Sequence, residues 1–293
     1  MPAVFVLIWS TGFIVAKYGL PYAPPLTFLA IRYFLSIACF LIWIVLARAS
    51  WPREGRQWLH LAVTGVLMQA GYLGGVWVAV KAGMGSGLTA LIVGLQPVLT
   101  ALWVSWAASG NAGESASRVT SRQWMGLALG LGGLLLVVSH KLGGGHEVTG
   151  LTLASTLFAL LSITVGTLYQ KRFVKPADVR CAGAVQMGAA LLVTLPLVFF
   201  ETGAVIWNHQ FVGAMAWSVL VLTLGGSSLL YLLIQRGAAM SVTSLLYLVP
   251  PTTALMAWLL FDEAITLTTV VGTALTALGV SFVVRPAKPP AVS

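Results

Sequence analysis

The feature that most constrains this chain is a succession of uninterrupted apolar runs. A helix needs about 20 apolar residues to cross roughly 30 Å of hydrocarbon. Charged residues make up only 8% of the 293 residues, whereas a soluble domain carries roughly 25%. The longest connection, Ser109 to Arg122, leaves no room for a soluble domain. An all-α integral membrane protein is therefore predicted, with one transmembrane helix in each of ten runs: 3–19, 25–47, 57–80, 84–108, 123–139, 149–170, 177–200, 210–235, 240–261 and 265–284.

The basic residues predict how the chain is oriented. With the N-terminus in the cytoplasm, twelve lysines and arginines fall in cytoplasmic connections and three fall at the outer ends of helices, while Arg32 lies within the second run. Cytoplasmic loops of membrane proteins carry the excess of positive charge, so both termini are predicted to be cytoplasmic. The formal charge of +9 is spread over short gaps and forms no single patch, and we therefore expect no binding of nucleic acid.

Catalytic chemistry is not indicated. Cys39 and Cys181 both lie inside apolar runs, so neither a disulfide framework nor a metal cluster is expected from them. The four histidines are scattered near loops or helix ends, and the Gly-Lys-Ser/Thr ending of a phosphate-binding loop is absent. We expect no catalytic residue, cofactor or metal, and a protein that is not an enzyme. An intramembrane enzyme and a structural scaffold remain the alternatives from other classes.

An internal repeat relates the two halves of the chain. At an offset of 154 residues, 81–83 corresponds to 235–237. At an offset of 146 residues, Gly126 and Gly133 correspond to Gly272 and Gly279. The two offsets differ by eight residues, and this difference falls in the loop 109–122, where an insertion costs least.

The repeat predicts two domains of five helices each, 1–142 and 147–285, followed by a cytoplasmic tail, 286–293. Because five is odd, the second half enters the membrane from the opposite side, which makes the repeat inverted. Inverted repeats enclose a binding site at the midplane and exchange roles to open it to either side. We therefore expect a central cavity and alternating access.

A set of residues in this chain matches the pattern of a known family. They lie in the first, second, fourth and ninth predicted helices and after the ninth: Trp9, Ser10, Lys17, Pro25, Arg32, Gln96, Pro97, Pro250, Pro251, Glu263, Gly272 and Gly279. In these the chain resembles the ten-helix EamA-type members of the drug/metabolite transporter superfamily, over nearly its whole length. Within that superfamily it looks most like bacterial exporters of aromatic and other neutral amino acids.

The resemblance implies a secondary transporter in the bacterial inner membrane, with amino acids as its small-molecule substrates, the lipid bilayer as its surroundings and no obligatory protein partner. Related members carry sugars, nucleotide sugars and drugs on the same frame, so a carrier of another metabolite is the alternative. The short multidrug relatives use a carboxylate in their first helix for proton exchange. Here no predicted span has an acid at mid-depth, and a carboxylate proton relay is therefore not expected.

Polar side chains in a bilayer core are costly unless they pair or face water, so polar stripes predict the pathway. Such stripes fall on helices 1, 3, 4, 8 and 9, which line the cavity in the resembled fold. For tyrosine and tryptophan the alternative is an interfacial belt, and for Gln96 it is a bond to a carbonyl freed by Pro97. The predicted substrate-binding residues are Trp9, Ser10, Gln69, Tyr72, Gln96, Thr100, Ser227, Ser228, Tyr231 and Tyr247.

Two cations and three prolines complete the candidates. Arg32 and Lys17 either hold a substrate carboxylate or fix one helix to a neighbour, and the second interpretation is favoured because helix 2 is peripheral in the resembled fold. Prolines remove backbone donors and weaken helices at matching places in both halves. The predicted hinges are Pro97, Pro250 and Pro251.

Overall fold

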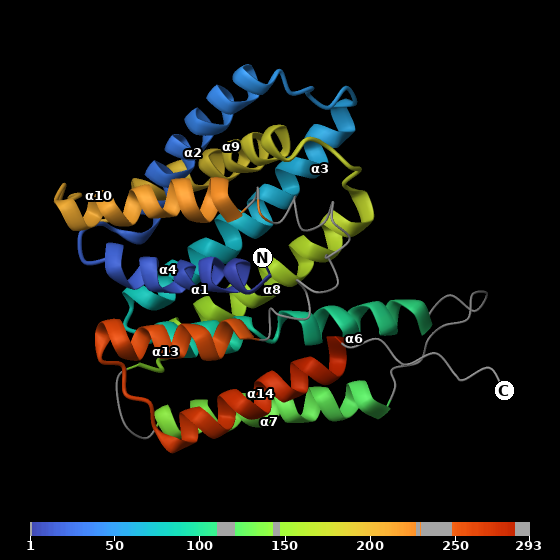
Figure 1. Cartoon of the computed structure of the whole chain (residues 1–293), viewed down its shortest axis with the longest axis vertical. Coiled ribbons are helices and arrows are strands. Elements are labelled where there is room, and N and C mark those ends of the chain that lie inside the picture. The colour runs from blue at the N-terminus through green and yellow to red at the C-terminus, as the bar shows by residue number, and fades with distance from the viewer. Residues whose placement is uncertain (1, 110–120, 143–146, 227–228, 230–247, 285–293) are drawn as a thin grey trace.

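The computed structural model describes residues 2–109, 121–142, 147–226, 229 and 248–284. All regular structure in these ranges is helical (Figure 1). Five helical segments are long and apolar enough to cross a membrane, and five shorter apolar ones accompany them, which gives ten among the described residues. The prediction of ten membrane helices is therefore confirmed.

The first half contains five crossings, two of which are built from several elements. The third crossing passes through a π-helical segment, η1, and the fourth is broken after Val93. Its elements are α1 (Pro2–Gly19), α2 (Pro25–Ala47), α3 (Gly55–Gly65), η1 (Val66–Gly71), α4 (Tyr72–Lys81), α5 (Ser86–Val93), α6 (Gln96–Ser109) and α7 (Ser121–Leu142).

The second half repeats this plan, including a π-helical segment, η2, in its third crossing. The predicted spans 210–235 and 240–261 are described only up to Gly226 and from Leu248 onward, apart from Leu229. Its elements are α8 (Gly150–Phe173), α9 (Val179–Val198), α10 (His209–Ala216), η2 (Trp217–Gly225), α13 (Val249–Phe261) and α14 (Leu267–Val284).

Short polar residues mark where several helices begin. Thr149 and Thr152 form a reciprocal capping box at the start of α8. The side chains of Asp178 and Asn208 accept backbone hydrogen bonds at the starts of α9 and α10. Pro25 occupies the first turn of α2, where the missing N–H would have had no partner within the helix. These caps fix where the chain turns back into the bundle.

The pairing of helices follows a two-fold pattern. The fifth crossing packs against the tenth (α7 on α14), the second against the seventh (α2 on α9) and the fourth against the ninth (α5 on α13). The contact of α4 with α8 is matched by that of α1 with α10, its equivalent when the halves are exchanged. In Figure 1, α7 and α14 lie side by side and run in opposite directions. The two halves are therefore inverted repeats.

Glycines bring α7 and α14 into backbone contact. A Cβ placed on Gly272 would lie 2.6 Å from the carbonyl oxygen of Gly133, and one on Gly279 would lie 2.5 Å from the amide nitrogen of Gly130 and closer still to the oxygen of Gly126. The contact is crossed, because Gly126 corresponds to Gly272 and Gly133 to Gly279. Gly126 therefore contacts Gly279, the equivalent of Gly133, and Gly133 contacts Gly272, the equivalent of Gly126. A two-fold axis between the halves requires this arrangement.

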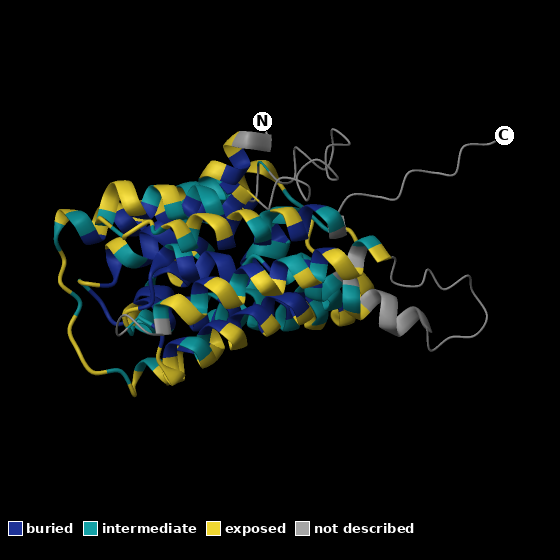
Figure 2. Cartoon of the chain, turned by 90° about the horizontal axis from the view of Figure 1, so that it is seen from below, coloured by how far each residue is buried: buried dark blue, intermediate teal, exposed yellow. Residues whose placement is uncertain are grey.

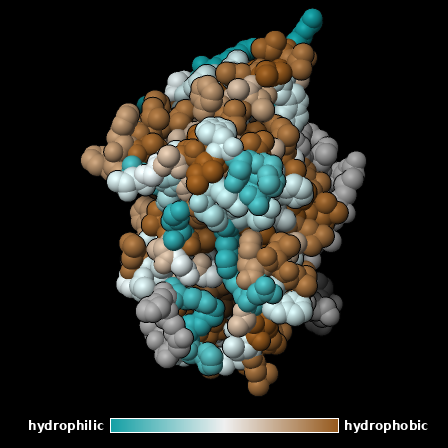
Figure 3. All heavy atoms as spheres, turned by 90° about the vertical axis from the view of Figure 1, so that its left-hand side faces the viewer, coloured by the Kyte–Doolittle hydropathy of each residue, from teal (hydrophilic) through white to brown (hydrophobic). Residues whose placement is uncertain are grey.

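The outside of the bundle is apolar. Large side chains on α2, α9 and α14 stand out from it, such as Phe34 at 63%, Phe199 at 84% and Leu267 at 80% exposure. Figure 2 shows buried residues filling the middle of the bundle and exposed ones along its outside. In water such a surface would promote association, whereas in a bilayer it faces acyl chains. Figure 3, seen from one end, shows polar atoms gathered in the middle of that end.

Ion pairs define the two ends of the bundle. At one end Lys17 contacts Glu263, and at the opposite end Lys175 contacts Glu54. We call these the Glu263 end and the Glu54 end. The basic-residue pattern predicts that the Glu263 end is the outer one.

Candidate functional site

The structure places six of the ten predicted substrate-binding residues. The other four, Ser227, Ser228, Tyr231 and Tyr247, lie outside the described residues. The central chamber that all ten would line therefore stays a prediction.

Gln69 and Tyr72 lie at the π-helical part of the third crossing. Gln69 is half-buried within η1, and Tyr72, at the start of α4, is 7% exposed. The carbonyl oxygen of Gln69 accepts a hydrogen bond of 2.8 Å from the hydroxyl of Tyr33 on α2. Single π-helical turns are rare and occur frequently at functional sites. A side chain that is buried in the bundle near the middle of its crossing does not fit an interfacial belt, so the belt interpretation is not favoured for Tyr72.

The break in the fourth crossing positions Gln96 and Pro97. A Cβ on Gly94 would lie 2.7 Å from the ring of Pro250, so only glycine fits where α13 crosses the break. Pro97 is in the first turn of α6, and Pro250 is in the first turn of α13. The predicted hinges therefore sit at helix starts that face each other across the two halves.

Gln96 and Thr100 use their hydrogen bonds differently. The side-chain amide of Gln96 donates to the hydroxyl of Thr167 on α8, at 3.1 Å. Gln96 therefore joins two helices, and the interpretation that it bonds a carbonyl freed by Pro97 is wrong for its amide nitrogen. Thr100 donates back to the carbonyl of Gln96 at 2.8 Å. Its hydroxyl hydrogen is thus taken by its own helix.

On α1, the two candidates have different surroundings. Ser10 is completely buried and donates to the carbonyl of Val6 at 2.8 Å, so its hydroxyl hydrogen is also taken by its own helix. Trp9 is half-buried, and its ring lies 5.4 Å from that of Phe5. Of these two, the indole of Trp9 is the one with surface left to contact a ligand.

Lys17 is engaged by an acidic residue of the second half. Its ammonium lies 2.6 Å from Glu263, whose carboxylate also accepts from the backbone N–H of Ser86 at 3.0 Å. Ser86 is the first residue of α5, where unpaired N–H groups and the helix dipole attract an anion. Lys17 therefore fits the second interpretation, a bond between helices.

Sequence reasoning missed Glu201. Its carboxylate accepts hydrogen bonds from the backbone N–H of Leu26 at 2.8 Å and of Thr27 at 2.7 Å, and so caps α2 from the opposite half. The available signal was an acid placed directly after an apolar run in a chain that has only seven acids. Because an acid in a loop is usually solvated, this signal alone does not predict that Glu201 caps a helix.

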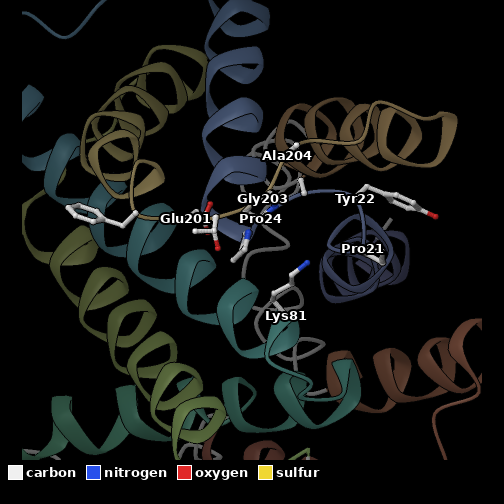
Figure 4. A pocket seen from close by; sticks show the side chains of 11 residues that line it. Pro21, Tyr22, Pro24, Lys81, Glu201, Gly203 and Ala204 are labelled. Carbon is white, nitrogen blue, oxygen red and sulfur yellow. The ribbon is translucent and has the colours of Figure 1, made fainter.

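A cavity of about 440 Å³ opens beside Glu201 at the Glu263 end. It is lined by the turn before α2, by the loop after α9 and by Lys81 (Figure 4). The ammonium of Lys81 points into this space and donates to the carbonyl of Leu20 at 2.6 Å. A second cavity of about 470 Å³ shares Lys81 and Tyr22 with the first. The two cavities therefore adjoin at this end of the bundle.

Arg32 is buried inside the bundle. It is 7% exposed, and its Nη2 donates to the hydroxyl of Thr223 in η2 at 3.2 Å. Its neighbour Tyr33 contacts η1 through Gln69. Two consecutive residues of α2 thus reach the π-helical segments of both halves. At an offset of 154, Gln69 corresponds to Thr223, so these are equivalent positions.

At the Glu54 end, two carboxyls have lowered pKa values. Hydrogen bonds from Lys175 lower the pKa of Glu54, and those from Arg180 lower the pKa of Asp178. The Glu54 pair is exposed and the Asp178 pair is half-buried, and both lie where connections meet helix starts.

No potential metal centre occurs among the described residues, where no group of three His, Cys, Asp or Glu comes together. Cys39 is half-buried and Cys181 is buried, and both carry free thiols.

An apolar bundle of ten helices in two inverted repeats, with polar groups buried between the halves, is the architecture of a membrane transporter. The sequence profile of the EamA-like transporter family matches the chain twice, at residues 3–139 and 149–285. The chain belongs to this family.

Two relatives and one solved structure illustrate the similarity. An uncharacterized transporter of Bacillus subtilis is 26% identical over 92% of this chain and 86% of its own length. A probable amino-acid metabolite efflux pump of Escherichia coli is 26% identical over 89% of this chain and 86% of its own length. A crystal structure with 18% identity superimposes with a TM-score of 0.65, covering 96% of this chain and 94% of the other. At that identity, the last similarity concerns the fold alone.

Proposed function

We propose that this transporter exports small neutral or aromatic amino acids across a bacterial inner membrane by alternating access, with both termini in the cytoplasm. The observation that carries the proposal is that neutral polar and aromatic groups lie within the bundle, while the carboxylates of the described residues lie at its ends. A zwitterion needs dipoles and apolar contact more than it needs a buried acid. The Escherichia coli relative described as an amino-acid metabolite efflux pump supports the same substrate class.

The proposed substrate site combines described and undescribed residues. Among the described ones, Trp9 and Tyr72 offer aromatic faces, and Gln69 and Gln96 offer amides. The second half would contribute Ser227, Ser228, Tyr231 and Tyr247. Ser10 and Thr100 are proposed to contribute their lone pairs, since their hydrogens are already used.

The proposed motion depends on the prolines at the starts of α6 and α13. Pro97 and Pro250 begin helices that meet at Gly94, and Pro251 follows in the same turn of α13. Movement of these first turns would tilt α6 and α13 while α7 and α14 stay joined by their glycines. The two proposed domains, 1–142 and 147–285, would exchange roles between the outward-open and inward-open states, with the tail 286–293 on the cytoplasmic side.

Transport by purified protein in proteoliposomes tests the substrate class. We expect uptake of labelled phenylalanine and threonine and no uptake of a labelled hexose. Tyr72→Ala should reduce uptake of phenylalanine, whereas Phe34→Ala, which changes a lipid-facing side chain of the first half, should leave it unchanged. Uptake of the hexose with neither amino acid would refute the proposal.

A second candidate is a carrier of uncharged metabolites or drugs, such as sugars and nucleosides. The same neutral polar groups favour it, because amides and hydroxyls bind sugar hydroxyls equally well. Growth on toxic amino-acid analogues separates the two candidates. Cells that express the protein should survive higher concentrations if amino acids are exported, and equal survival would favour the second candidate.

A further inference from the structure

Arg32 is a buried cation in a chain that places no acid within its membrane spans. Its side chain lies in the span of α2 and is 7% exposed. The seven acids all fall in turns, connections or helix ends of the sequence, so none can neutralise a charge at that depth. They are Glu54, Glu114, Glu147, Asp178, Glu201, Asp262 and Glu263.

Several of these carboxylates also have other partners. Four form the ion pairs of the described residues, with Lys17, Lys141, Lys175 and Arg180. Glu201 accepts the backbone N–H groups that begin α2. Within the described residues, no carboxylate contacts Arg32.

The guanidinium of Arg32 also has an unused donor. Its Nη2 donates to Thr223 at 3.2 Å, but its Nε has no hydrogen-bond partner within the described part of the chain. A charged donor buried without a partner is destabilising, and in a bilayer such residues are usually functional. A charge-assisted hydrogen bond from Nε to an anion would remove this cost.

The surroundings of Arg32 belong to both halves. Thr223 belongs to η2, the hydroxyl of Tyr72 is close enough to interact electrostatically with the guanidinium, and Tyr33 ties the next residue to η1. Arg32 therefore lies near one predicted substrate-site residue, Tyr72, and its neighbour Tyr33 contacts another, Gln69. Helix 2 is peripheral in the resembled fold, yet this side chain faces the interior.

We propose that Arg32 binds the carboxylate of the transported amino acid, with Thr223 orienting the guanidinium and Tyr72 beside it. This inference rests on the proposed function. A guanidinium presents N–H groups in a planar fork that matches the two oxygens of a carboxylate. Solutes without a carboxylate leave Nε unpaired and should bind less well.

Competition against labelled phenylalanine in proteoliposomes tests the proposal. Phenylalaninamide keeps the ring and the amine of phenylalanine but replaces the carboxylate by a neutral amide. For the wild-type protein we expect the half-inhibitory concentration of phenylalaninamide to exceed that of phenylalanine about tenfold or more, as for a hydrogen bond between charged groups. In Arg32→Gln, this ratio should fall close to one.

Two variants control for structural damage. Tyr33→Phe removes a buried hydrogen bond from the adjacent residue without changing any charge, and should keep the wild-type ratio. Arg32→Lys keeps the charge but loses the fork, so its ratio should lie between those of wild type and Arg32→Gln. If Arg32→Gln does not fold, the inhibition ratios of the wild type and of Arg32→Lys still decide whether the guanidinium binds the carboxylate.

The possible failures are distinct. A wild-type protein that carries phenylalanine but is inhibited equally by both compounds overturns the inference and leaves the proposed function standing. An Arg32→Gln variant that keeps the wild-type ratio does the same. A wild-type protein that carries no amino acid overturns both.

Discussion

The glycine contact between α7 and α14 allows a quantitative test with neighbouring residues. A Cβ on Gly133 would lie 2.7 Å from Oγ1 of Thr276, 2.9 Å from Cβ of Leu275 and closer still to the oxygen of Gly272, whereas one on Gly132 would meet nothing within 4 Å. Replacing either glycine by alanine adds the same methyl group to the same helix. The two variants therefore differ only in what that methyl group meets.

The expected magnitudes have opposite signs. In an exposed helix, glycine is less favourable than alanine by about 1 kcal/mol, so Gly132→Ala should be neutral or stabilising. In Gly133→Ala the two helices must move apart by about 0.7 Å or more to restore ordinary van der Waals contact. A gap of that size removes a quarter to a half of the dispersion energy of each atom pair that is separated. Overpacking of this kind typically costs about 1–3 kcal/mol. The gain in helix propensity is the same for both substitutions, so we expect Gly133→Ala to be the less stable of the two by about 1–3 kcal/mol.

Thermal stability of the purified protein in detergent measures this difference. We would follow the fraction that remains monodisperse after heating, and expect Gly133→Ala to lose half of it at a temperature roughly 5 °C below that of Gly132→Ala. Gly279→Ala should resemble Gly133→Ala, and the double variant should lose less than the sum, because one separation relieves both clashes. A Gly133→Ala protein as stable as Gly132→Ala would refute the close contact.

Three further changes probe other parts of the bundle. Glu263→Gln should lower the stability measured by heating in detergent by about 1–2 kcal/mol, because it leaves the half-buried ammonium of Lys17 unpaired. Adding Lys17→Met should recover part of this loss, and no recovery would argue against the ion pair. Replacing Pro97 and Pro250 together by Ala should slow uptake in proteoliposomes, and unchanged uptake would reject the hinges. The pKa of Asp178 is lowered, so its ion pair stabilises the fold above the ordinary pKa of 3.8 and loses this effect as pH falls through the lowered value. Asp178→Asn should therefore be less stable at neutral pH and match the wild type in strong acid, measured as thermal stability against pH.

The helices could be predicted from sequence because the bilayer fixes their length and composition. The spacing of Gly126, Gly133, Gly272 and Gly279 also predicted the repeat, since close helix contact in membranes selects small residues. The break after Val93 lies four residues before Pro97, whose missing N–H weakens the helix at that point. The contact of Gly94 with the ring of Pro250 at this break could not be predicted, because Pro250 belongs to the other half.

The candidate site was predicted less completely. Composition and position in the span single out Arg32 as unusual, but sequence alone does not show which face of a helix meets the interior. The choice between helix anchoring and substrate contact therefore stays a prediction. Glu201 was overlooked because a carboxylate in a connection is normally hydrated. For Gln96 the depth was informative, whereas its partner, Thr167, is 71 positions away in the chain and could only be found in three dimensions.

The matching π-helical segments also bear on ancestry. A π-helical turn holds one residue more than the α-helical turn it replaces. At the offset of 154, η1 falls on the last six residues of η2, and both segments end at the same equivalent position. One insertion in a single five-helix ancestor, copied when its gene was duplicated and fused, explains both segments at once. Each half would then preserve the geometry of a protein that once worked as a pair of identical chains inserted in opposite directions.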